Sequence, residues 1–382
     1  MVELIATTNE RRMSDVLIGQ RKDELCYKTG MEKTLKELGF VPFFSQQVAV
    51  EDIECGRIGR VVEVQRSQIT VSDGSNELSI PLTSNVYSGE PEDRPTVGDW
   101  VRLDEQQQKV EQVLNRKSVF RRLASGENSE LQLIAANVDV LFIVTSCNDE
   151  FKESRLERYL ALAVEAGVVP VVVLTKIDLS DDPDSFVKRA RKIQAGVAVE
   201  PVNALDEGTF AGLKAWIDVG STIGVVGSSG VGKSTILNSL MQTPIAATSG
   251  IREHDTKGRH TTTHRALYKL PDGGLLIDVP GIRELKVSDV DDALAVVFDD
   301  IEALASNCRF ADCVHQNEPG CAVLDAVKNG KIEERRWRNY LKLQLENERN
   351  SASLAEKRLK GRNFAKLVQE AKAIKKGVGT NN

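Results

Sequence analysis

The chain has 382 residues, and its 50 Lys and Arg against 56 Asp and Glu give a formal net charge of −6. This length predicts two or three domains, each large enough to bury a core, and the 41% apolar and 28% charged residues argue against intrinsic disorder. Taken alone, the net charge argues mildly against a nucleic-acid partner. The most apolar run, Val168–Leu174, is shorter than the roughly 18 residues that span a bilayer, and residues 1–25 lack a signal-peptide pattern. We therefore expect a cytoplasmic protein without a membrane partner.

The pattern of apolar and turn residues predicts the first two of four segments. Residues 1–45 form an N-terminal extension, in which the spacing from Met31 to Leu38 predicts a helix that ends at Gly39. Residues 46–115 hold short apolar runs separated by Gly and Asp turns, which predicts about five β-strands in a small barrel. An oligonucleotide/oligosaccharide-binding (OB) barrel and another small barrel of the SH3 type fit this pattern equally well.

Strand and helix patterns alternate in the third segment, residues 116–287, and this alternation predicts an α/β domain with a parallel sheet covered on both faces. The fourth segment, residues 288–382, has a helical pattern and contains a cysteine cluster. In the third segment, the expected strands cover residues 138–145, 169–175, 223–226 and 275–279, and the expected helices cover residues 154–165 and 186–195.

A glycine-rich loop follows the expected strand at residues 223–226 and matches the pattern GxxxxGK[ST] of phosphate-binding loops. Glycines allow successive backbone N–H groups to face phosphate oxygens, and the N-terminus of the following helix adds positive potential. Lys233 would bind the β- and γ-phosphates, and Ser234 would ligate Mg²⁺. The predicted nucleotide-binding residues of this loop are Gly227, Ser228, Ser229, Gly230, Val231, Gly232, Lys233, Ser234 and Thr235.

A run that resembles the [NT]KxD signature of Ras-like GTPases stands at the end of the expected strand at residues 169–175. It comprises Thr175, Lys176, Ile177 and Asp178. The carboxylate of Asp178 can accept hydrogen bonds from N1–H and the exocyclic amine of guanine, a donor pair that adenine lacks, and Lys176 would lay its stem over the base. A Lys-x-Asp at a strand end is common on protein surfaces, but beside a phosphate loop it predicts GTP rather than ATP.

Two further stretches resemble nucleotide-binding motifs. Asn203 and Ala204 stand where such GTPases often have a Ser-Ala pair that supports the base. Asp278 and Gly281 match DxxG, so Asp278 would hold Mg²⁺, directly or through water, and the N–H of Gly281 would sense the γ-phosphate. The base motif precedes the phosphate loop, whereas Ras-like GTPases have the reverse order. The sheet can therefore match theirs only if the chain is circularly permuted.

A threonine-rich stretch lies between the phosphate loop and DxxG, and one of Thr261, Thr262 and Thr263 would close over Mg²⁺ in the GTP state. Ras-like enzymes use a Gln after DxxG to orient the attacking water, but Ile282 stands there in this chain. We therefore expect slow intrinsic hydrolysis unless another group supplies this function. His260 is the nearest candidate, and an ordinary solvated loop histidine is the alternative.

Three cysteines and one histidine fall within 14 residues and are Cys308, Cys313, His315 and Cys321. Three thiolates and one imidazole make a closed tetrahedral zinc set, and a set without an open position is structural rather than catalytic. Buried free cysteines are the alternative. The cluster therefore predicts a metal site that folds the surrounding loop.

Together these motifs resemble one family, the circularly permuted, ribosome small subunit-dependent GTPase A. The resemblance covers roughly residues 40–345 and rests on the barrel pattern and on TKID, GSSGVGKST, HTTT, DVPGIRE and CRFADCVHQNEPGC. It implies a multidomain chain with an N-terminal OB barrel, a circularly permuted P-loop GTPase domain and a C-terminal zinc-binding helical subdomain. It also implies GTP/GDP with Mg²⁺, one structural Zn²⁺, and GTP hydrolysis stimulated by the small ribosomal subunit during late maturation of that subunit.

Two functions from different classes fit these motifs. The favoured one is a monomeric GTPase that binds the small ribosomal subunit and its rRNA under the control of GTP. The alternative is a nucleotide-gated RNA-binding module in which hydrolysis is incidental, a reading that Ile282 slightly favours. An ATPase is a third option, and it fails if ATP does not compete with GTP.

The net charge of −6 averages over unlike parts of the chain. Residues 328–376 contain 15 Lys and Arg and 6 Asp and Glu, which gives +9 for this segment and leaves −15 for the remainder. This imbalance predicts a basic arm that faces RNA and whose affinity falls with salt, with a solvated helix face as the alternative. Truncation after about residue 330 would then weaken ribosome binding more than GTP binding.

Overall fold

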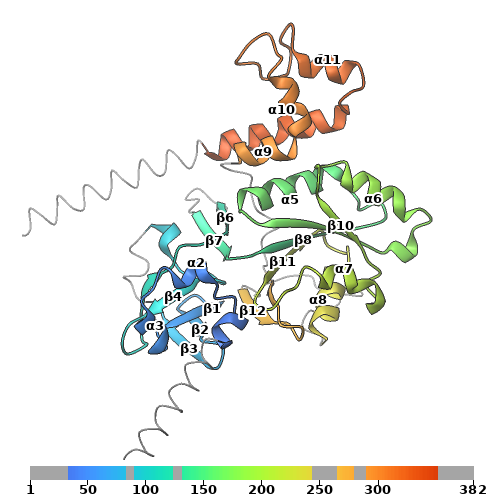
Figure 1. Ribbon diagram of the computed structural model, residues 1–382. Helices are drawn as coiled ribbons and strands as arrows, with labels where there is room; N and C mark the ends of the chain where they lie inside the picture. Colours follow the sequence, from blue (N-terminus) through green and yellow to red (C-terminus); the bar gives the residue numbers. More distant parts are fainter. Residues whose placement is uncertain (1–32, 83–89, 124–130, 243–264, 279–289, 352–382) are drawn as a thin grey trace, which may run out of the picture. The chain divides into compact units, whose positions relative to one another are not determined.

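The computed structural model describes residues 33–82, 90–123, 131–242, 265–278 and 290–351 (Figure 1). Packing divides the chain into two compact units, which are described separately. The sheet unit comprises Met1–Phe151, Ala166–Val187 and Ala198–Glu284, and the helical unit comprises Lys152–Glu165, Lys188–Val197 and Leu285–Asn382. Four of the predicted site residues lie outside the described residues, namely His260, Thr261, Thr262 and Gly281.

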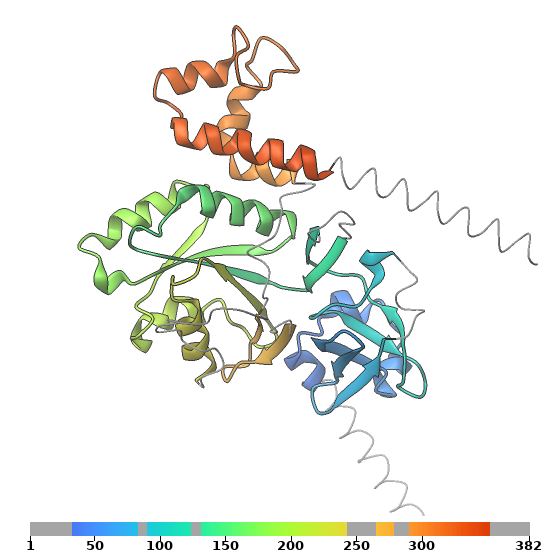
Figure 2. The ribbon, with the colours of Figure 1, turned by 180° about the vertical axis from the view of Figure 1, so that it is seen from behind.

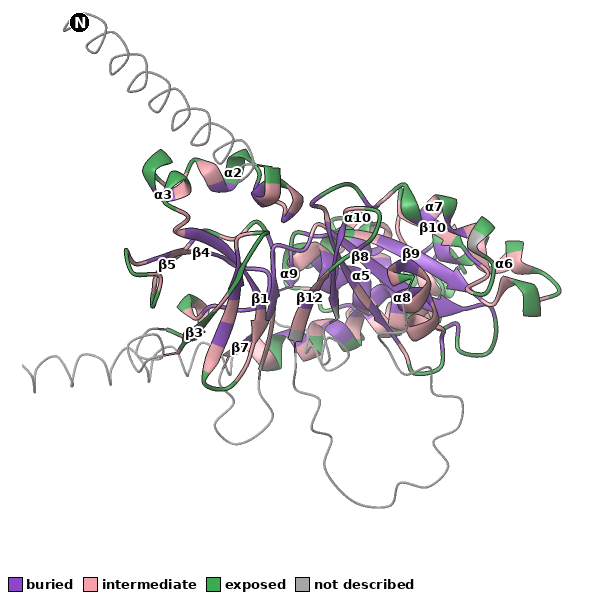
Figure 3. Ribbon diagram, turned by 90° about the horizontal axis from the view of Figure 1, so that it is seen from below, coloured by how far each residue is buried: buried purple, intermediate pink, exposed green. Residues whose placement is uncertain are grey.

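Six strands of the sheet unit form the predicted α/β sheet, and in chain order they are β8 (Val140–Ser146), β9 (Val169–Thr175), β10 (Ala198–Pro201), β11 (Thr222–Gly227), β12 (Arg265–Lys269) and β13 (Leu275–Asp278). Their order in the sheet is β10-β9-β8-β11-β13-β12. All neighbours are parallel except β12, which runs antiparallel to β13. Every residue of β8 is buried (Figure 3), which is the pattern of a parallel strand without a solvent-facing side.

The strand predicted at residues 169–175 is confirmed with both of its ends. The other predicted strands are present with small shifts. The strand β8 begins at Val140, later than the expected residue 138, and Asn137 just before this stretch has a left-handed φ of 55°. The strand β12 was not predicted, and it lies directly after residues that the structure does not describe.

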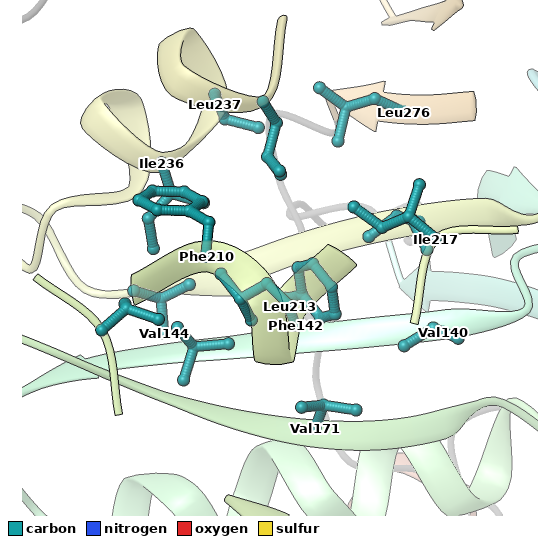
Figure 4. Packing of buried hydrophobic residues seen from close by; sticks show 14 of the residues in the cluster. Val140, Phe142, Val144, Val171, Phe210, Leu213, Ile217, Ile236, Leu237 and Leu276 are labelled. Carbon is teal, nitrogen blue, oxygen red and sulfur yellow. The ribbon is translucent and has the colours of Figure 1, made fainter. Parts of the chain in front are cut away.

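One buried apolar cluster fixes the helix that follows the phosphate loop. Helix α8 (Lys233–Met241) contributes Ile236 and Leu237 to this cluster, which also contains Phe142 and Val144 of β8 (Figure 4). Phe210, at the end of the short turn η3 (Glu207–Phe210), and helix α7 (Ala211–Lys214) complete it. Burial of these side chains holds the start of α8 in place relative to the strands.

The helix predicted at residues 186–195 is present with different ends. Helix α6 (Pro183–Arg191) begins earlier because the Asp182 carboxylate accepts a hydrogen bond from the backbone N–H of Ser185, at 3.2 Å, and so caps the first turn. Pro183 fits the first helical position, where its missing N–H costs nothing. The other predicted helix is confirmed as α5 (Glu153–Glu165).

The barrel segment contains the five predicted strands, β1 (Ile58–Val64), β2 (Gln68–Ser72), β3 (Glu77–Pro81), β4 (Trp100–Leu103) and β5 (Val110–Val113). They pair antiparallel in the order β3-β2-β1-β4-β5 and enclose an apolar cluster that includes Val61, Ile69 and Val101. The turn between β2 and β3 is one of the predicted Gly and Asp turns: the Asp73 carboxylate accepts the backbone N–H groups of Ser75 and Asn76, and Gly74 has a φ of 94°. Strand β1 also pairs with β12, which joins both sheets into one.

Short elements surround the barrel, and the sequence predicted only the first of them. Residues 33–37 are helical and end at Gly39, whose φ is 87°, with a hydrogen bond from Phe40 N to Leu35 O of 2.9 Å. The elements that the sequence did not predict are α2 (Pro42–Ser45), α3 (Val50–Glu54), the turn η1 (Pro91–Asp93) and the paired strands β6 (Val119–Leu123) and β7 (Leu131–Ala136).

The helical unit contains α5 together with the C-terminal helices (Figure 2). These are α9 (Asp291–Val297), α10 (Asp299–Ala305), α11 (Ala322–Lys328) and a helix over residues 334–351. The buried Arg336 connects α10 and α5 within this unit. Its guanidinium donates to Asp300 Oδ2 of α10 at 2.8 Å and to Glu157 Oε1 of α5 at 3.1 Å. Glu157 is fully buried and also accepts hydrogen bonds from Arg335 and Asn339. In the described part of the chain, no helix has both the length and the apolar character of a membrane span.

Candidate functional site: the nucleotide loops and a four-ligand cluster

The phosphate loop connects the end of β11 to the start of α8, as predicted. Gly227, Gly230 and Gly232 have φ values of 147°, 77° and 95°, which side chains with a Cβ rarely adopt. Gly227 is also constrained by packing, because a Cβ there would lie 2.2 Å from the carbonyl oxygen of Val144. The glycines therefore permit a tight loop that lies directly on β8.

The polar side chains of this loop lie at the start of α8. Lys233, Ser234 and Thr235 are partly buried, and the Lys233 ammonium donates to the carbonyl oxygen of Ser228. The helix N-terminus contributes free N–H groups and a positive partial charge at the same place. The arrangement provides a cationic side chain, hydroxyls and backbone donors, which are the groups that a nucleotide phosphate with Mg²⁺ requires.

The predicted base loop turns sharply away from the sheet after β9. Lys176 has a left-handed φ of 57°, and a 3-10 turn, η2 (Ile177–Leu179), follows it. This turn places Asp178 in an exposed position. A carboxylate that is open to solvent at the end of a parallel strand is accessible to a ligand.

Thr175, predicted as a nucleotide-binding residue, connects the base loop to the phosphate loop. Its side chain is completely buried, and its hydroxyl lies 2.6 Å from the carbonyl oxygen of Val231 and 3.2 Å from that of Thr145. A Cβ on Gly232 would lie 3.5 Å from the Thr175 hydroxyl, an ordinary contact, so it is the φ of 95° rather than space that favours glycine there. The first residue of the motif therefore positions two loops, a role that spacing alone does not reveal.

The second predicted base loop follows β10, the strand beside β9. The Asn203 side chain accepts a hydrogen bond from Leu205 N at 3.0 Å, and Thr209 Oγ1 donates to Asn203 O at 3.0 Å. Ser239 of α8 donates to Ala204 O at 3.4 Å. The loop is thus fixed internally and is tied to the helix that follows the phosphate loop.

The strand order explains how motifs in an unusual chain order meet at one place. Strand β11, which leads into the phosphate loop, lies between β8 and β13, although β8 and β9 come first along the chain. Asp278 ends β13, and Thr175 ends β9. Because parallel strands deliver their C-terminal ends to one edge of a sheet, the three motifs leave from the same edge. The predicted circular permutation is confirmed.

Four potential metal ligands of the helical unit converge, and they are the four predicted ones: Cys308, Cys313, His315 and Cys321. The sulfurs of Cys308 and Cys321 are 3.8 Å apart, and the three Cys Sγ atoms lie 3.4 to 3.6 Å from His315 Nδ1. A tetrahedral zinc ion with ordinary bond lengths requires about 3.8 Å between sulfurs and about 3.6 Å between sulfur and nitrogen. The cluster therefore fits Zn²⁺ bound through Nδ1.

The protonation chemistry of the cluster also suits a metal. Burial lowers the pKa of His315, which favours the neutral imidazole that a metal binds. Burial and the neighbouring thiols raise the pKa of Cys313 to about 12, so the thiols cannot all ionise without a cation beside them. Binding of a divalent cation would therefore displace protons from this site.

Glu318 organises the cluster loop, a role that its position in the sequence does not predict. Its carboxylate accepts hydrogen bonds from the backbone N–H groups of Val314, Gln316 and Asn317, at 2.9 to 3.1 Å. A hydrogen bond from its own backbone N–H, together with these three bonds, outweighs burial and lowers the pKa of Glu318. The loop between His315 and Cys321 is therefore shaped by one acidic side chain, whose only sequence signal was its place inside the motif.

Comparisons with known proteins agree with this geometry. The family model described as RsgA GTPase matches residues 113–288. A protein of Vibrio vulnificus described as small ribosomal subunit biogenesis GTPase RsgA 2 is 46% identical over 349 residues, which are 91% of this chain and 97% of the relative. The chain belongs to the RsgA GTPase family. A second RsgA, from Mesorhizobium japonicum, is 42% identical over 85% of this chain and 92% of its own.

A solved structure supports the fold of this RsgA-family chain. The crystal structure of YjeQ from Thermotoga maritima aligns with a TM-score of 0.55 at 28% identity, covering 75% of this chain and 96% of the other. The family predicted from the motifs is thus confirmed. The chain is a GTPase, which implies GTP and GDP with Mg²⁺.

Proposed function

We propose that this RsgA-family GTPase hydrolyses GTP in late maturation of the small ribosomal subunit, and that GTP controls its binding to the subunit and its rRNA. The observation that carries this proposal is the 46% identity, over 91% of the chain, to a relative described as a small ribosomal subunit biogenesis GTPase. We expect the protein to act as a monomer in the cytoplasm.

The nucleotide loops support specific roles for six residues. Lys233 would bind the β- and γ-phosphates, and Ser234 would ligate Mg²⁺. Asp178 would accept hydrogen bonds from the two donor groups of guanine. Asp278 would hold Mg²⁺ from the neighbouring strand, and the Lys176 stem would cover the base. The magnesium ion neutralises phosphate charge when it is bound. Thr175 would hold the base loop and the phosphate loop at a fixed separation, through its hydrogen bond to Val231 O.

The residues that respond to the γ-phosphate are proposed from sequence alone. Thr261 or Thr262 would close over Mg²⁺, and the N–H of Gly281 would sense the γ-phosphate. His260 would orient the attacking water, because Ile282 has no polar group for this purpose. The loops would relax after hydrolysis and release the subunit.

The four-ligand cluster would hold one structural Zn²⁺. Its four ligand atoms lie within 4.8 Å of one another. The Cys308–Cys321 separation and the three Cys–His315 separations are close to those of a closed tetrahedron. A bound zinc ion supplies a cross-link that replaces an apolar core in a small loop. Cys308, Cys313, His315 and Cys321 would then fix the loop for a contact with the subunit.

Single-turnover GTP hydrolysis with and without purified small subunits tests the proposal. We expect slow hydrolysis by the protein alone and clear stimulation by subunits. Lack of stimulation would overturn the GTPase cycle and leave the alternative, a nucleotide-gated RNA-binding module with incidental hydrolysis, which the residue Ile282 favours. A His260→Ala variant with unchanged stimulated turnover would remove His260 from the mechanism, and competition by ATP would remove the guanine preference of Asp178.

A further inference from the structure

The loop that carries the four-ligand cluster exposes an aromatic ring beside a cation. Phe310 follows Cys308 closely in the chain and is 42% exposed, although large aromatic side chains are usually buried. The guanidinium carbon of the exposed Arg309 lies 5.5 Å from the centre of the Phe310 ring. The ring and the guanidinium are therefore both accessible to a ligand.

The backbone holds the Arg309–Phe310 pair in place. Arg309 N donates to Gly320 O at 3.1 Å, and Cys313 N donates to Phe310 O at 3.3 Å. A Cβ on Gly320 would lie 3.1 Å from Arg309 Cβ and 3.3 Å from its Cδ, so the glycine provides the space for the arginine stem. The pair is therefore presented on a fixed support, which lowers the entropy lost when a ligand covers it.

The charges near the pair leave the guanidinium available. Among the described residues, no carboxylate forms an ion pair with Arg309. The nearby Glu318 carboxylate is occupied by three backbone N–H groups of its own loop. Residues 328–376 carry 15 Lys and Arg against 6 Asp and Glu. Arg335, Arg336 and Arg338 pair with carboxylates, but the remaining cations still outnumber the acidic residues, which complements a polyanion.

We infer that Arg309 and Phe310 form a stacking site for one unpaired base of single-stranded RNA. This inference rests on the proposed function, because it names the RNA feature that the cluster loop would contact. Unpaired bases stack on aromatic rings and guanidinium planes, and an arginine also attracts the adjacent phosphate. A protein partner is the competing occupant of an exposed Phe and Arg, and the basic segment favours RNA.

The test measures binding of the full-length, zinc-loaded protein to a labelled single-stranded RNA 12-mer, to a duplex of equal length and to small-subunit rRNA free of ribosomal proteins. Phe310→Ala should weaken binding of the single strand and of the rRNA about tenfold and leave duplex binding unchanged. Phe310→Tyr should restore wild-type binding, because a tyrosine ring also stacks. Val296→Ala is the matched control, since Val296 is an apolar side chain of similar exposure, 46%, in the same unit.

Salt dependence separates the two members of the pair. Arg309→Ala should lower the slope of log affinity against log salt by about one phosphate contact, whereas Phe310→Ala should leave the slope unchanged. Wild-type binding of naked RNA by Phe310→Ala overturns the inference, and a loss seen only with intact subunits assigns the pair to a protein contact instead. If subunits do not stimulate wild-type GTPase activity, the proposed function fails. The RNA-binding measurements still test whether Arg309 and Phe310 bind an unpaired base.

Discussion

The phosphate loop and the four-ligand cluster are both short motifs, yet the protein holds them in different ways. The phosphate loop depends on distant parts of the chain, because Gly227 packs against Val144 and Thr175 bonds to Val231. The cluster draws its four ligands from one short stretch, and its separations already match a metal. A motif assembled from distant strands depends on the folded sheet for its conformation, whereas a local ligand cluster depends on its bound ion.

The largest expected effect comes from breaking the cluster. Cys321→Ser should abolish tight zinc binding and unfold the cluster loop, because a structural zinc ion contributes about 10 kcal/mol or more to local folding. GTP affinity should change little, since the nucleotide loops belong to the sheet unit. The zinc content after dialysis measures the loss of the ion, and thermal unfolding followed with two probes measures the unfolding of the cluster loop. Cys55→Ser, at an exposed free thiol, is the control, and full zinc retention by Cys321→Ser would contradict the assignment.

Removal of a phosphate-binding side chain should weaken nucleotide binding and leave zinc binding unchanged, the reverse of the effect of Cys321→Ser. Lys233→Ala should weaken GTP and GDP binding about a hundredfold, because a charge-assisted contact of about 3 kcal/mol is lost. Zinc content should stay at the wild-type level. Titration with a fluorescent guanine nucleotide measures the affinity, and Lys188→Ala, on the exposed surface of α6, is the matched control. Equal affinities for the two variants would rule out Lys233 as a phosphate ligand.

Two glycines of the same loop test the dependence on distant packing. Gly227→Ala should destabilise the sheet unit by about 2 kcal/mol more than Gly230→Ala. Both positions have positive φ, but a Cβ at 227 would collide with Val144 O, whereas nothing lies within 4 Å of a Cβ at 230. Urea unfolding of the two variants gives the difference. Equal free energies of unfolding would show that the loop does not rest on β8.

The smallest expected effect concerns a surface charge pair of the helical unit. Burial raises the pKa of Glu153, but its own backbone N–H and Arg189, 2.5 Å away, outweigh burial and lower the pKa overall. A lowered folded pKa stabilises the protein above the unfolded value of about 4.3, and this contribution disappears as pH falls through the folded value.

Glu153→Gln should therefore cost at most about 0.5 kcal/mol at pH 7, because the pair is partly exposed, and nothing at pH 3. Urea unfolding at both pH values measures the change, with Glu348→Gln as the control at an exposed glutamate. A cost that persists at pH 3 would assign the effect to packing rather than to charge.

The sequence was most informative where the chemistry is local. The strand at residues 169–175, which is buried from its third residue on, the phosphate loop and the four metal ligands were predicted because apolar runs and ligand spacings lie within short windows. The short helices near the barrel and the pair β6–β7 were missed, because elements of a few residues carry no periodic signal. The boundaries of the four predicted segments, at residues 45, 115 and 287, stay predictions.

Long-range pairing was the part that the sequence could not provide. Arg335, Arg336 and Arg338 had been counted with the basic arm, but each of them pairs with a carboxylate. Arg335 and Arg336 bond to Glu157, which lies more than 170 residues earlier in the chain. No spacing rule relates two residues so far apart. The positive charge available to RNA in the described part of this segment is therefore smaller than the count of residues suggests.

The buried Glu157 changes the interpretation of binding experiments on a truncated chain. A chain that ended after residue 330 would lack Arg335, Arg336 and Asn339, and the fully buried carboxylate would lose all three donors. An uncompensated buried charge costs about 3–5 kcal/mol, and α5, which carries it, leads directly into β9 and the base loop. Weak ribosome binding by such a chain would report damage to the GTPase fold as well as the missing arm. Single substitutions of exposed cations, such as Lys342 and Arg349, isolate the arm without that damage.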